Sequence, residues 1–228
     1  NPYYGHKRVA LALNINRKRA LRVMKKFGLA PKVKKRRRPR KREDEGSLQA
    51  KYLNLVKYSC PIRPNVVWVT DFTYILYQGR FWYLATVMDV YTRKILAWQV
   101  SSNRSKELVT NTLKEALLNT NKVPLTVHSD QGSEYLSYLF TRFLESLDIK
   151  VSMSQKASPW ENGFQESFYS RFKSEMDDFN QYSIIGELIE AIHFQINYYN
   201  KRRLHTSLDT SPVKFHQQYL KKHRRITL

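Results

Sequence analysis

The sequence predicts an α/β fold in which a mixed sheet of five strands carries helices on both faces. Three strand-like runs joined by short turns come first, over residues 66–77, 80–92 and 94–102. Short strands then alternate with helical patterns, and helices complete the domain. A meander that leads into alternating helices and strands is typical of one sheet buried on both sides. A small helical module and a basic segment precede this domain.

Residues 1–30 predict a pair of short helices, similar to a helix-turn-helix module. Asn14 or Asn16 can cap the second helix, and Gly28 can end it. Basic side chains separate its apolar positions, and a solvated helix without a base-reading role is the alternative to DNA binding. The candidate DNA contacts here are Arg17, Lys18, Arg19 and Arg22. The chain begins at Asn1 and not at Met, so the module is expected to be truncated.

Residues 31–46 form a basic linker or arm. Because its like charges repel and its prolines interrupt helices, it is expected to become ordered only against phosphates. Residues 1–46 carry 17 Lys or Arg and 3 Asp or Glu, which accounts for most of the formal charge of +21. This balance predicts a nucleic-acid partner. The candidate DNA contacts in the arm are Lys34, Lys35, Arg36, Arg37, Arg38 and Arg40.

Composition excludes several other classes of protein. A hydrophobic fraction of 42% supports a buried core, but no run approaches the roughly 18 apolar residues of a membrane helix. The basic run Lys32–Arg42 lacks the large apolar residues of a helix that lies on a membrane. The single Cys60 leaves no disulfide framework and no cysteine-rich zinc site, which fits a reducing compartment. We therefore expect no membrane partner.

Residues 47–65 connect the arm to the main domain, residues 66–202, and 203–228 form a C-terminal tail. We expect a short helix at Ser47–Val56. The run 66–77 is apolar and rich in β-branched residues, as in a strand buried on both faces. After the meander, periodicity predicts helix 105–119, strand 124–128, helix 133–147, strand 150–153, a helix from Ser158 and a helix over 185–200.

Three acids differ from the basic background. Asp71 lies inside the apolar first strand, where an ionised carboxylate is costly unless it binds a metal ion or a cation. Asp130 follows a strand, at the edge where open α/β sheets bind ligands, although a turn-forming role is the alternative. Glu166 lies on a polar helix face with Lys173, a candidate phosphate contact. Carboxylates held on rigid elements can bind two divalent cations, which can cut and join phosphodiesters.

Other polar residues compete for these roles or support them. Glu161 is the rival of Glu166, but the capping box that begins at Ser158 already explains Glu161. Asp89 lies on the strand expected to pair with that of Asp71, and we assign it a supporting role. His128 is two residues before Asp130 and points to the same side, so it either orients a ligand or packs as a strand histidine.

Five ordered motifs carry a resemblance to a known family. They are VWVTDFTYI, MDVYTR, HSDQGSEY, SPWENGFQESFYSRFKSE and YNKRRLHTSLDTSPVKF. With them the chain resembles the catalytic subunit of bacterial insertion-sequence transposases of the OrfB class, with a retroviral-integrase-type Asp-Asp-Glu core. The 35 residues between Asp130 and Glu166 equal the family spacing, and the resemblance covers nearly the whole chain.

The resemblance implies an RNase H-like core in which Asp71, Asp130 and Glu166 bind two Mg²⁺ ions, with Mn²⁺ as a substitute. Asn162 and Gly163 match the family motif before the glutamate. The implied activity is hydrolysis at transposon ends to free a 3′-hydroxyl, followed by attack of that hydroxyl on target DNA. A homodimer or larger assembly on DNA is expected, in the bacterial cytoplasm and at the nucleoid when bound. The alternatives are a structure-selective nuclease on the same fold and a non-enzymatic DNA-binding regulator.

Overall fold

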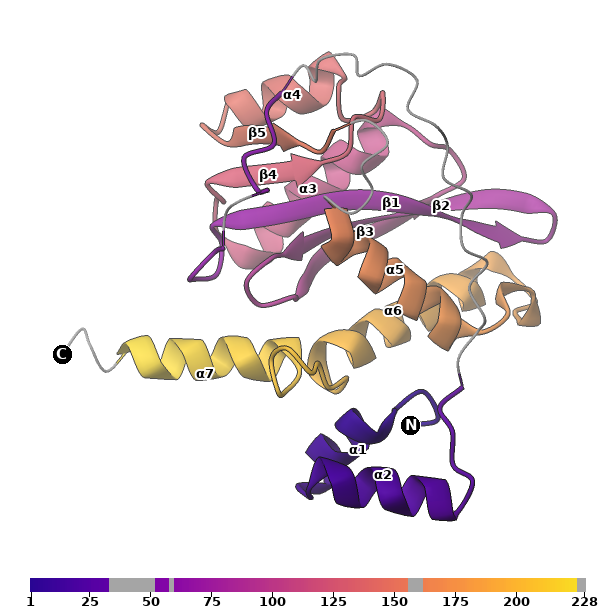
Figure 1. Cartoon of the computed structure of the whole chain (residues 1–228). Helices are drawn as coiled ribbons and strands as arrows, with labels where there is room; N and C mark the ends of the chain where they lie inside the picture. The colour runs from indigo at the N-terminus through magenta and orange to yellow at the C-terminus, as the bar shows by residue number, and fades with distance from the viewer. Residues whose placement is uncertain (33–51, 58–59, 156–161, 225–228) are drawn as a thin grey trace.

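The computed structural model of the protein describes residues 1–32, 52–57, 60–155 and 162–224 (Figure 1). Most of the basic arm lies outside these residues, as does the predicted capping box from Ser158 to Glu161. The arm positions outside them include the candidate DNA contacts Lys34, Lys35, Arg36, Arg37, Arg38 and Arg40. These predictions therefore rest on the sequence alone.

The helix predicted over Ser47–Val56 is wrong for the part that the structure describes. Residues 52–56 are not helical. The side chain of Asn54 accepts hydrogen bonds from the backbone N–H groups of Val56 and Lys57, at 3.0 and 2.9 Å. An Asn side chain that bonds the backbone just ahead of it favours a turn over a helix.

The N-terminal module consists of helices α1 (His6–Leu13) and α2 (Arg17–Lys26), as predicted. Asn16 caps α2, because its side chain accepts a hydrogen bond from the Lys18 N–H at 2.8 Å. Gly28 has a φ of 62°, which suits the residue that follows a helix end. The module touches the main domain through Tyr4, whose hydroxyl accepts a hydrogen bond from the Leu204 N–H at 2.9 Å.

The main domain contains one five-stranded sheet with the order β3-β2-β1-β4-β5. The strands are β1 (Val67–Tyr77), β2 (Arg80–Asp89), β3 (Ile95–Ser101), β4 (Thr126–Ser129) and β5 (Lys150–Met153). The first three form an antiparallel meander, and β4 and β5 run parallel to β1. This is the mixed sheet that the sequence predicts.

Two details of the sheet differ from the prediction. Strand β1 is fully buried only over its first residues, 67–70, because β4 pairs with Val67–Val69 alone and the rest of β1 extends beyond it. The second strand ends at Asp89 and not at residue 92. The Asp89 carboxylate accepts hydrogen bonds from the N–H and hydroxyl of Thr92, at 2.7 and 2.6 Å, and so forms the turn to β3.

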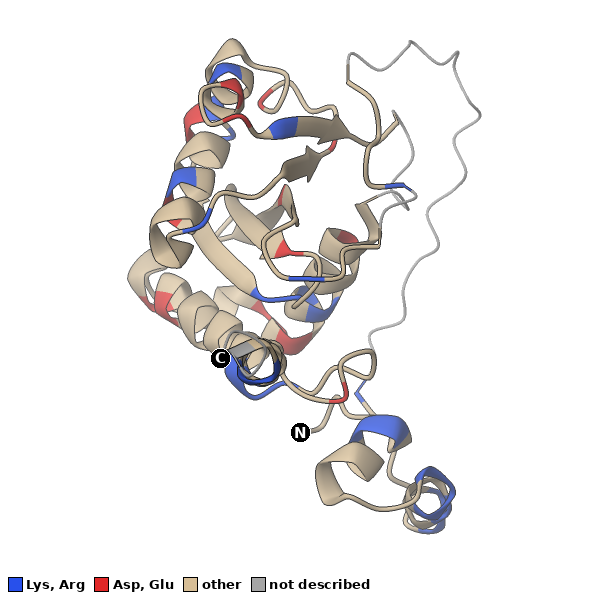
Figure 2. Cartoon of the chain, turned by 90° about the vertical axis from the view of Figure 1, so that its left-hand side faces the viewer, with Lys and Arg blue, Asp and Glu red and all other residues tan. Residues whose placement is uncertain are grey.

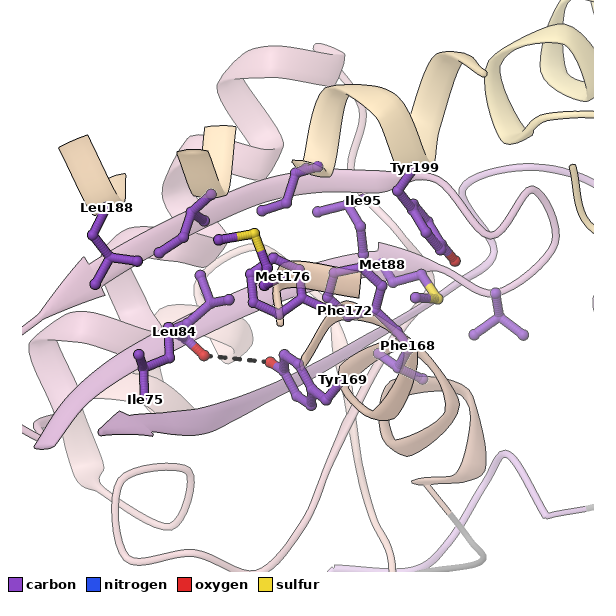
Figure 3. Close-up of a cluster of buried hydrophobic side chains, with 14 of the residues drawn as sticks. Ile75, Leu84, Met88, Ile95, Phe168, Tyr169, Phe172, Met176, Leu188 and Tyr199 are labelled. Carbon is purple, nitrogen blue, oxygen red and sulfur yellow. Dashed lines mark hydrogen bonds between the residues drawn. The ribbon is translucent and has the colours of Figure 1, made fainter. Parts of the chain in front are cut away.

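Helices cover both faces of the sheet (Figure 1). Helices α3 (Lys106–Thr120) and α4 (Tyr138–Glu145) pack on one face. Helices α5 (Gly163–Met176) and α6 (Ile185–Lys201) pack on the other. Figure 3 shows Phe168 and Phe172 of α5 among the buried side chains of the second face. The apolar stripe of α5 is therefore turned toward the sheet, which leaves its polar face outside.

Two helices depart from the sequence prediction. Helix α4 begins at Tyr138 and not at Ser133, because Ser137 caps it and the residues before it turn back onto Gly132. Helix α7 (Pro212–Arg224) lies in the segment that we predicted only as a tail. Tyr91 packs against Phe215 in a tilted arrangement and against Tyr219 edge to face, with ring centroids 5.4 and 5.5 Å apart, and so attaches α7 to the main domain.

Candidate active site

Asp71 on β1 and Asp130, which directly follows β4, lie level with each other. Strands β1 and β4 are parallel, and Val69 pairs with His128. Asp71 follows Val69 by two residues, and Asp130 follows His128 by two residues. Side chains two residues apart in a strand share a face, so Asp71 lies on the face of Val67 and Val69, which is the face that α5 covers. The parallel pairing therefore brings together two acids that are separated by 58 residues in the sequence.

The pKa of Asp71 responds to the charges of both other acids. Burial raises the pKa of Asp71 well above its usual value, and the charges of Asp130 and Glu166 raise it further. A hydrogen bond from the Phe72 N–H, at 2.8 Å, opposes this rise. Like charges act on one another in this way only when they are near and poorly screened. The three acids thus share one electrostatic environment.

A turn around Gly132 fixes the orientation of Asp130. The Gly132 N–H donates to Oδ1 of Asp130 at 2.9 Å. Burial raises the pKa of Asp130, while this hydrogen bond and the charge of Arg104 lower it. A side chain at position 132 would place its Cβ 3.0 Å from Oδ1 of Asp130 and 3.2 Å from Oε2 of Glu134. A larger residue here would press on both carboxylates, which would have to shift by a few tenths of an ångström.

Glu166 is held in place by its neighbour in sequence. Gln165 is fully buried, and its amide nitrogen donates to the carbonyl oxygens of Val69 and Thr86, at 2.9 and 3.3 Å. The Thr86 hydroxyl donates to the amide oxygen of Gln165 at 3.0 Å. These bonds attach the first turn of α5 to β1 and β2, and they leave Glu166 on the exposed side of the helix.

One turn further along α5, Tyr169 adds a second attachment. Its hydroxyl donates to the carbonyl oxygen of Asp71 itself at 2.6 Å and lies 2.8 Å from the Thr86 hydroxyl. Figure 3 shows the longer contact of this hydroxyl with the Leu84 carbonyl, at 3.5 Å. The helix of Glu166 and the strand of Asp71 are thus tied directly to each other.

Arg104 and Glu134 form an ion pair beside Asp130 that the sequence reasoning missed. The Arg104 guanidinium contacts the Glu134 carboxylate at 2.5 and 2.8 Å and lies 4.7 Å from the centroid of the Phe72 ring. Burial would raise the pKa of Glu134, but the hydrogen bond and charge of Arg104 outweigh it, so the pKa lies below its usual value. In the sequence, the only sign of a role for Glu134 beside Asp130 is its position four residues further along the chain.

The donors of the triad fit a hard divalent cation. All three are carboxylates, and oxygen is the ligand that Mg²⁺ prefers. The repulsion that raises the pKa of Asp71 is the kind that a cation relieves. In the part of the chain that the structure describes, no three His, Cys, Asp or Glu side chains lie close enough together to hold one ion. The exposed side chain of Glu166 would therefore have to turn toward the two aspartates.

The supporting residues occupy different places. Asp89 is buried at the far end of β2, where it also accepts a hydrogen bond from the Asn65 N–H at 2.7 Å, away from Asp71. His128 is buried, and its Nδ1 lies 2.9 Å from the hydroxyl of Ser152 on β5. Asn162 is buried just before α5, and Gly163 begins that helix. Asp89 and His128 thus hold the sheet and its turns, whereas Asn162 and Gly163 adjoin Glu166.

The basic candidates lie in two places. Lys173 is on α5, with its Nζ 4.3 Å from the centroid of the Tyr74 ring, and burial lowers the pKa of Lys173. It lines a groove of about 720 Å³ together with Glu166 and Ser170. The other candidates are exposed on α2, in the N-terminal module away from the sheet (Figure 2): Arg17, Lys18, Arg19 and Arg22. None of the helices in the described ranges is both long and apolar enough to span a membrane.

Comparisons with known proteins match this architecture. Residues 61–159 match a family model described as an integrase core domain, and residues 147–212 match a second model of the same description. The chain is 19% identical to the HTLV-2 integrase catalytic core domain, solved in complex with magnesium, with a TM-score of 0.58 over 68% of this chain and 98% of that one. This likeness shows that the fold is RNase H-like.

Two proteins of similar sequence identify the family more closely than the fold does. The chain is 32% identical to the InsK protein of insertion sequence element IS150 from Escherichia coli (strain K12), over 94% of this chain and 78% of that protein. It is 36% identical to the transposase for insertion sequence element IS904 from Lactococcus lactis, over 68% of this chain and 62% of that protein. The chain therefore belongs to the insertion-sequence transposases with an integrase core domain.

Proposed function

We propose that this protein cleaves the ends of its insertion sequence to free 3′-hydroxyl groups and joins those ends to target DNA. The pairing of Val69 with His128 carries the proposal, because it sets Asp71 and Asp130 side by side under the helix of Glu166. A buried carboxylate whose pKa is raised by two further acids suits a polynucleotidyl transferase better than a structural role, since such repulsion without a counter-ion destabilises the fold.

Asp71, Asp130 and Glu166 are the residues that would hold two Mg²⁺ ions, or Mn²⁺ as a substitute. Such ions, when bound, would activate the attacking oxygen and stabilise the leaving oxygen of an in-line displacement. Water and a DNA 3′-hydroxyl are both oxygen nucleophiles, so one site serves hydrolysis and joining. No side chain has to form a covalent bond with DNA.

The surrounding residues position this triad. Gln165 and Tyr169 hold α5 against β1 and β2, and Gly132 fixes the carboxylate of Asp130. Arg104 neutralises Glu134, which would otherwise repel a phosphate close to Asp130. Lys173 lies further along the groove of Glu166, where it is placed to contact the phosphate backbone.

The basic face of α2 and the basic arm would supply most of the non-specific DNA affinity. Their charge draws DNA to the catalytic domain without reading its sequence. Because two ends of an insertion sequence have to be cut together, we expect a dimer or larger assembly on DNA. Light scattering of the complex tests this, and a single protein molecule per DNA complex would contradict it.

The variant Glu166→Gln tests the triad. It keeps the size of the side chain and removes the charge, so we expect DNA binding to persist and Mg²⁺-dependent cleavage and joining to fall by orders of magnitude. Glu190→Gln on α6 is the matched control, because Glu190 is also an exposed helix glutamate but lies outside the groove of Glu166. Full activity of Glu166→Gln with Mg²⁺ would refute the assignment.

A substrate with a pre-cut 3′ end separates transposition from the alternatives. A transposase joins this end to a second duplex, whereas a structure-selective nuclease only cleaves. A non-enzymatic regulator does neither and gains no thermal stability from Mg²⁺. Joined product from the wild type, and none from Glu166→Gln, is the result expected of a transposase.

A further inference from the structure

Four arginines and one histidine gather beside the first turns of α5, outside the acidic triad. This arginine cluster consists of Arg8, Arg93, Arg171, Arg203 and His205. Its members come from α1, the turn between β2 and β3, α5 and the loop after α6. Segments far apart in the chain thus converge on one basic point, and one of them belongs to the N-terminal module.

The cluster contains a buried ion pair. Glu175 pairs with the cluster through Arg203, at 2.6 and 2.9 Å. Both side chains of that pair are almost fully buried, and the Glu175 carboxylate also accepts a hydrogen bond from Gln195 at 2.9 Å. Its capacity is largely used by Arg203, so it does little to balance the charges of Arg8 and Arg93.

Several nitrogen atoms of the cluster are buried without a hydrogen-bond partner among the described residues. They are Nε of Arg8, Nη1 of Arg93, Nη1 of Arg203 and Nε2 of His205. Arg203 is only 2% exposed and still lines the groove of Glu166. A buried donor without a partner costs about 1–3 kcal/mol, and more when it is charged. Several such donors in one place indicate a site built for an acceptor from outside the chain.

The cluster opens onto two adjoining hollows. Arg8, Arg171 and Arg203 line the groove that also holds Glu166 and Lys173. A neighbouring cavity of about 390 Å³ is lined by Arg8, Arg93, Arg171 and His205. Gly163, the first residue of α5, borders both hollows. The positive end of the α5 dipole adds to the attraction for an anion at this point.

Electrostatics favour the binding of an anion at this point. Burial and the charges of the four arginines lower the pKa of His205 to about 3. Burial and the charges of Arg203 and Arg171 lower the pKa of Arg8 to about 10. Arginines crowd together at this cost where a polyanion is to be bound, because the phosphate offsets their repulsion.

We propose that the arginine cluster binds a backbone phosphate of the DNA strand that runs along the groove of α5 past Glu166. This rests on the proposed function for the identity of the strand, but the phosphate chemistry rests on the cluster alone. Through Arg8 the bound phosphate also bridges the N-terminal module and the catalytic domain. The cluster then fixes the strand beside the triad and links DNA capture to the placement of the module.

DNA affinity measured against salt concentration tests the site. The probe is a labelled duplex of random sequence, followed by fluorescence anisotropy with the full chain. Each variant Arg8→Gln and Arg171→Gln should lower the slope of log Kobs against log salt by about 1, as loss of one phosphate contact does. Lys122→Gln is the charge-matched control, because Lys122 is exposed in the loop before β4, at the opposite end of that strand from Asp130. Its slope should stay at the wild-type value.

Equal slopes for the wild type and both cluster variants would overturn the proposal, and so would a slope loss in the control as large as in the cluster variants. Arg203→Gln is not used, since it leaves Glu175 buried and unpaired and can unfold the chain.

Thermal melts with inorganic phosphate, against chloride at equal ionic strength, provide a readout that does not depend on catalysis. Phosphate should raise the Tm of the wild type more than that of Arg8→Gln. A phosphate effect on Tm without any effect of the variants on the DNA slope would identify free phosphate as the ligand and overturn the DNA assignment. If strand transfer fails while both the Tm and slope effects hold, the proposed function fails and the phosphate site stands.

Discussion

Replacement of Gln165 by Leu tests how the helix of the third acid is held. Leu keeps the approximate volume and removes the amide, which makes three hydrogen bonds of 2.9, 3.0 and 3.3 Å with Val69 and Thr86. Each bond contributes about 0.5–1.5 kcal/mol net, so the variant should lose roughly 2–4 kcal/mol of unfolding free energy. For a chain of this length that corresponds to a fall in Tm of roughly 5–15 °C.

The variant Gln165→Leu should lose more activity than its loss of stability alone explains. Gln165 precedes Glu166, so loss of its bonds loosens the first turn of α5 over the sheet. A displacement of about 1 Å at a catalytic group can cost on the order of 100-fold in rate. Urea denaturation measures the stability, and Mg²⁺-dependent joining of a pre-cut end, at a temperature where the variant is folded, measures the activity.

Gln218→Leu is the matched control, because Gln218 is an exposed glutamine on α7. It should change the unfolding free energy by less than about 0.5 kcal/mol. If Gln165→Leu lost no more stability than this control, the buried amide would not be what attaches α5. If it lost stability but joined DNA at the wild-type rate, the link from Gln165 to the placement of Glu166 would be wrong.

Three further predictions concern the acids and the arm. Because the pKa of Asp71 is raised in the fold, this group stabilises the metal-free protein at acid pH and loses that contribution as pH rises. The variant Asp71→Asn should therefore be more stable than the wild type at neutral pH. Urea titrations that show the opposite would contradict the raised pKa. Gly132→Ala should slow cleavage at least about tenfold by displacing Asp130, while Gly186→Ala, whose added Cβ meets only an ordinary 3.7 Å contact, should not. Deletion of Lys32–Arg42 should weaken DNA binding and reduce its salt slope with little change in Tm; an unchanged slope would make the arm a tether only.

The sheet was largely predictable because its strands depend on local patterns. The meander over 66–102 and the short strand at 150–153 follow from β-branched apolar runs and turns, which act over neighbouring residues. The errors arose where a polar side chain competes with that pattern. Asn54 replaces a helix by a turn, and Asp89 ends its strand early. Helix α7 was predicted only as a tail, and its packing on Tyr91 is a tertiary contact that the sequence does not show.

Several features can be read from the sequence alone: the identities, order and spacing of the three acids, the strand-rich core and the concentration of positive charge before residue 47. Which of these groups meet depends on how the chain folds. The parallel pairing of β1 and β4 sets Asp71 beside Asp130, and the buried amide of Gln165 turns Glu166 outward. The ion pair of Arg104 with Glu134 and the arginine cluster likewise join residues that no local pattern connects. Electrostatic contact depends on distance in space, which only the folded chain defines.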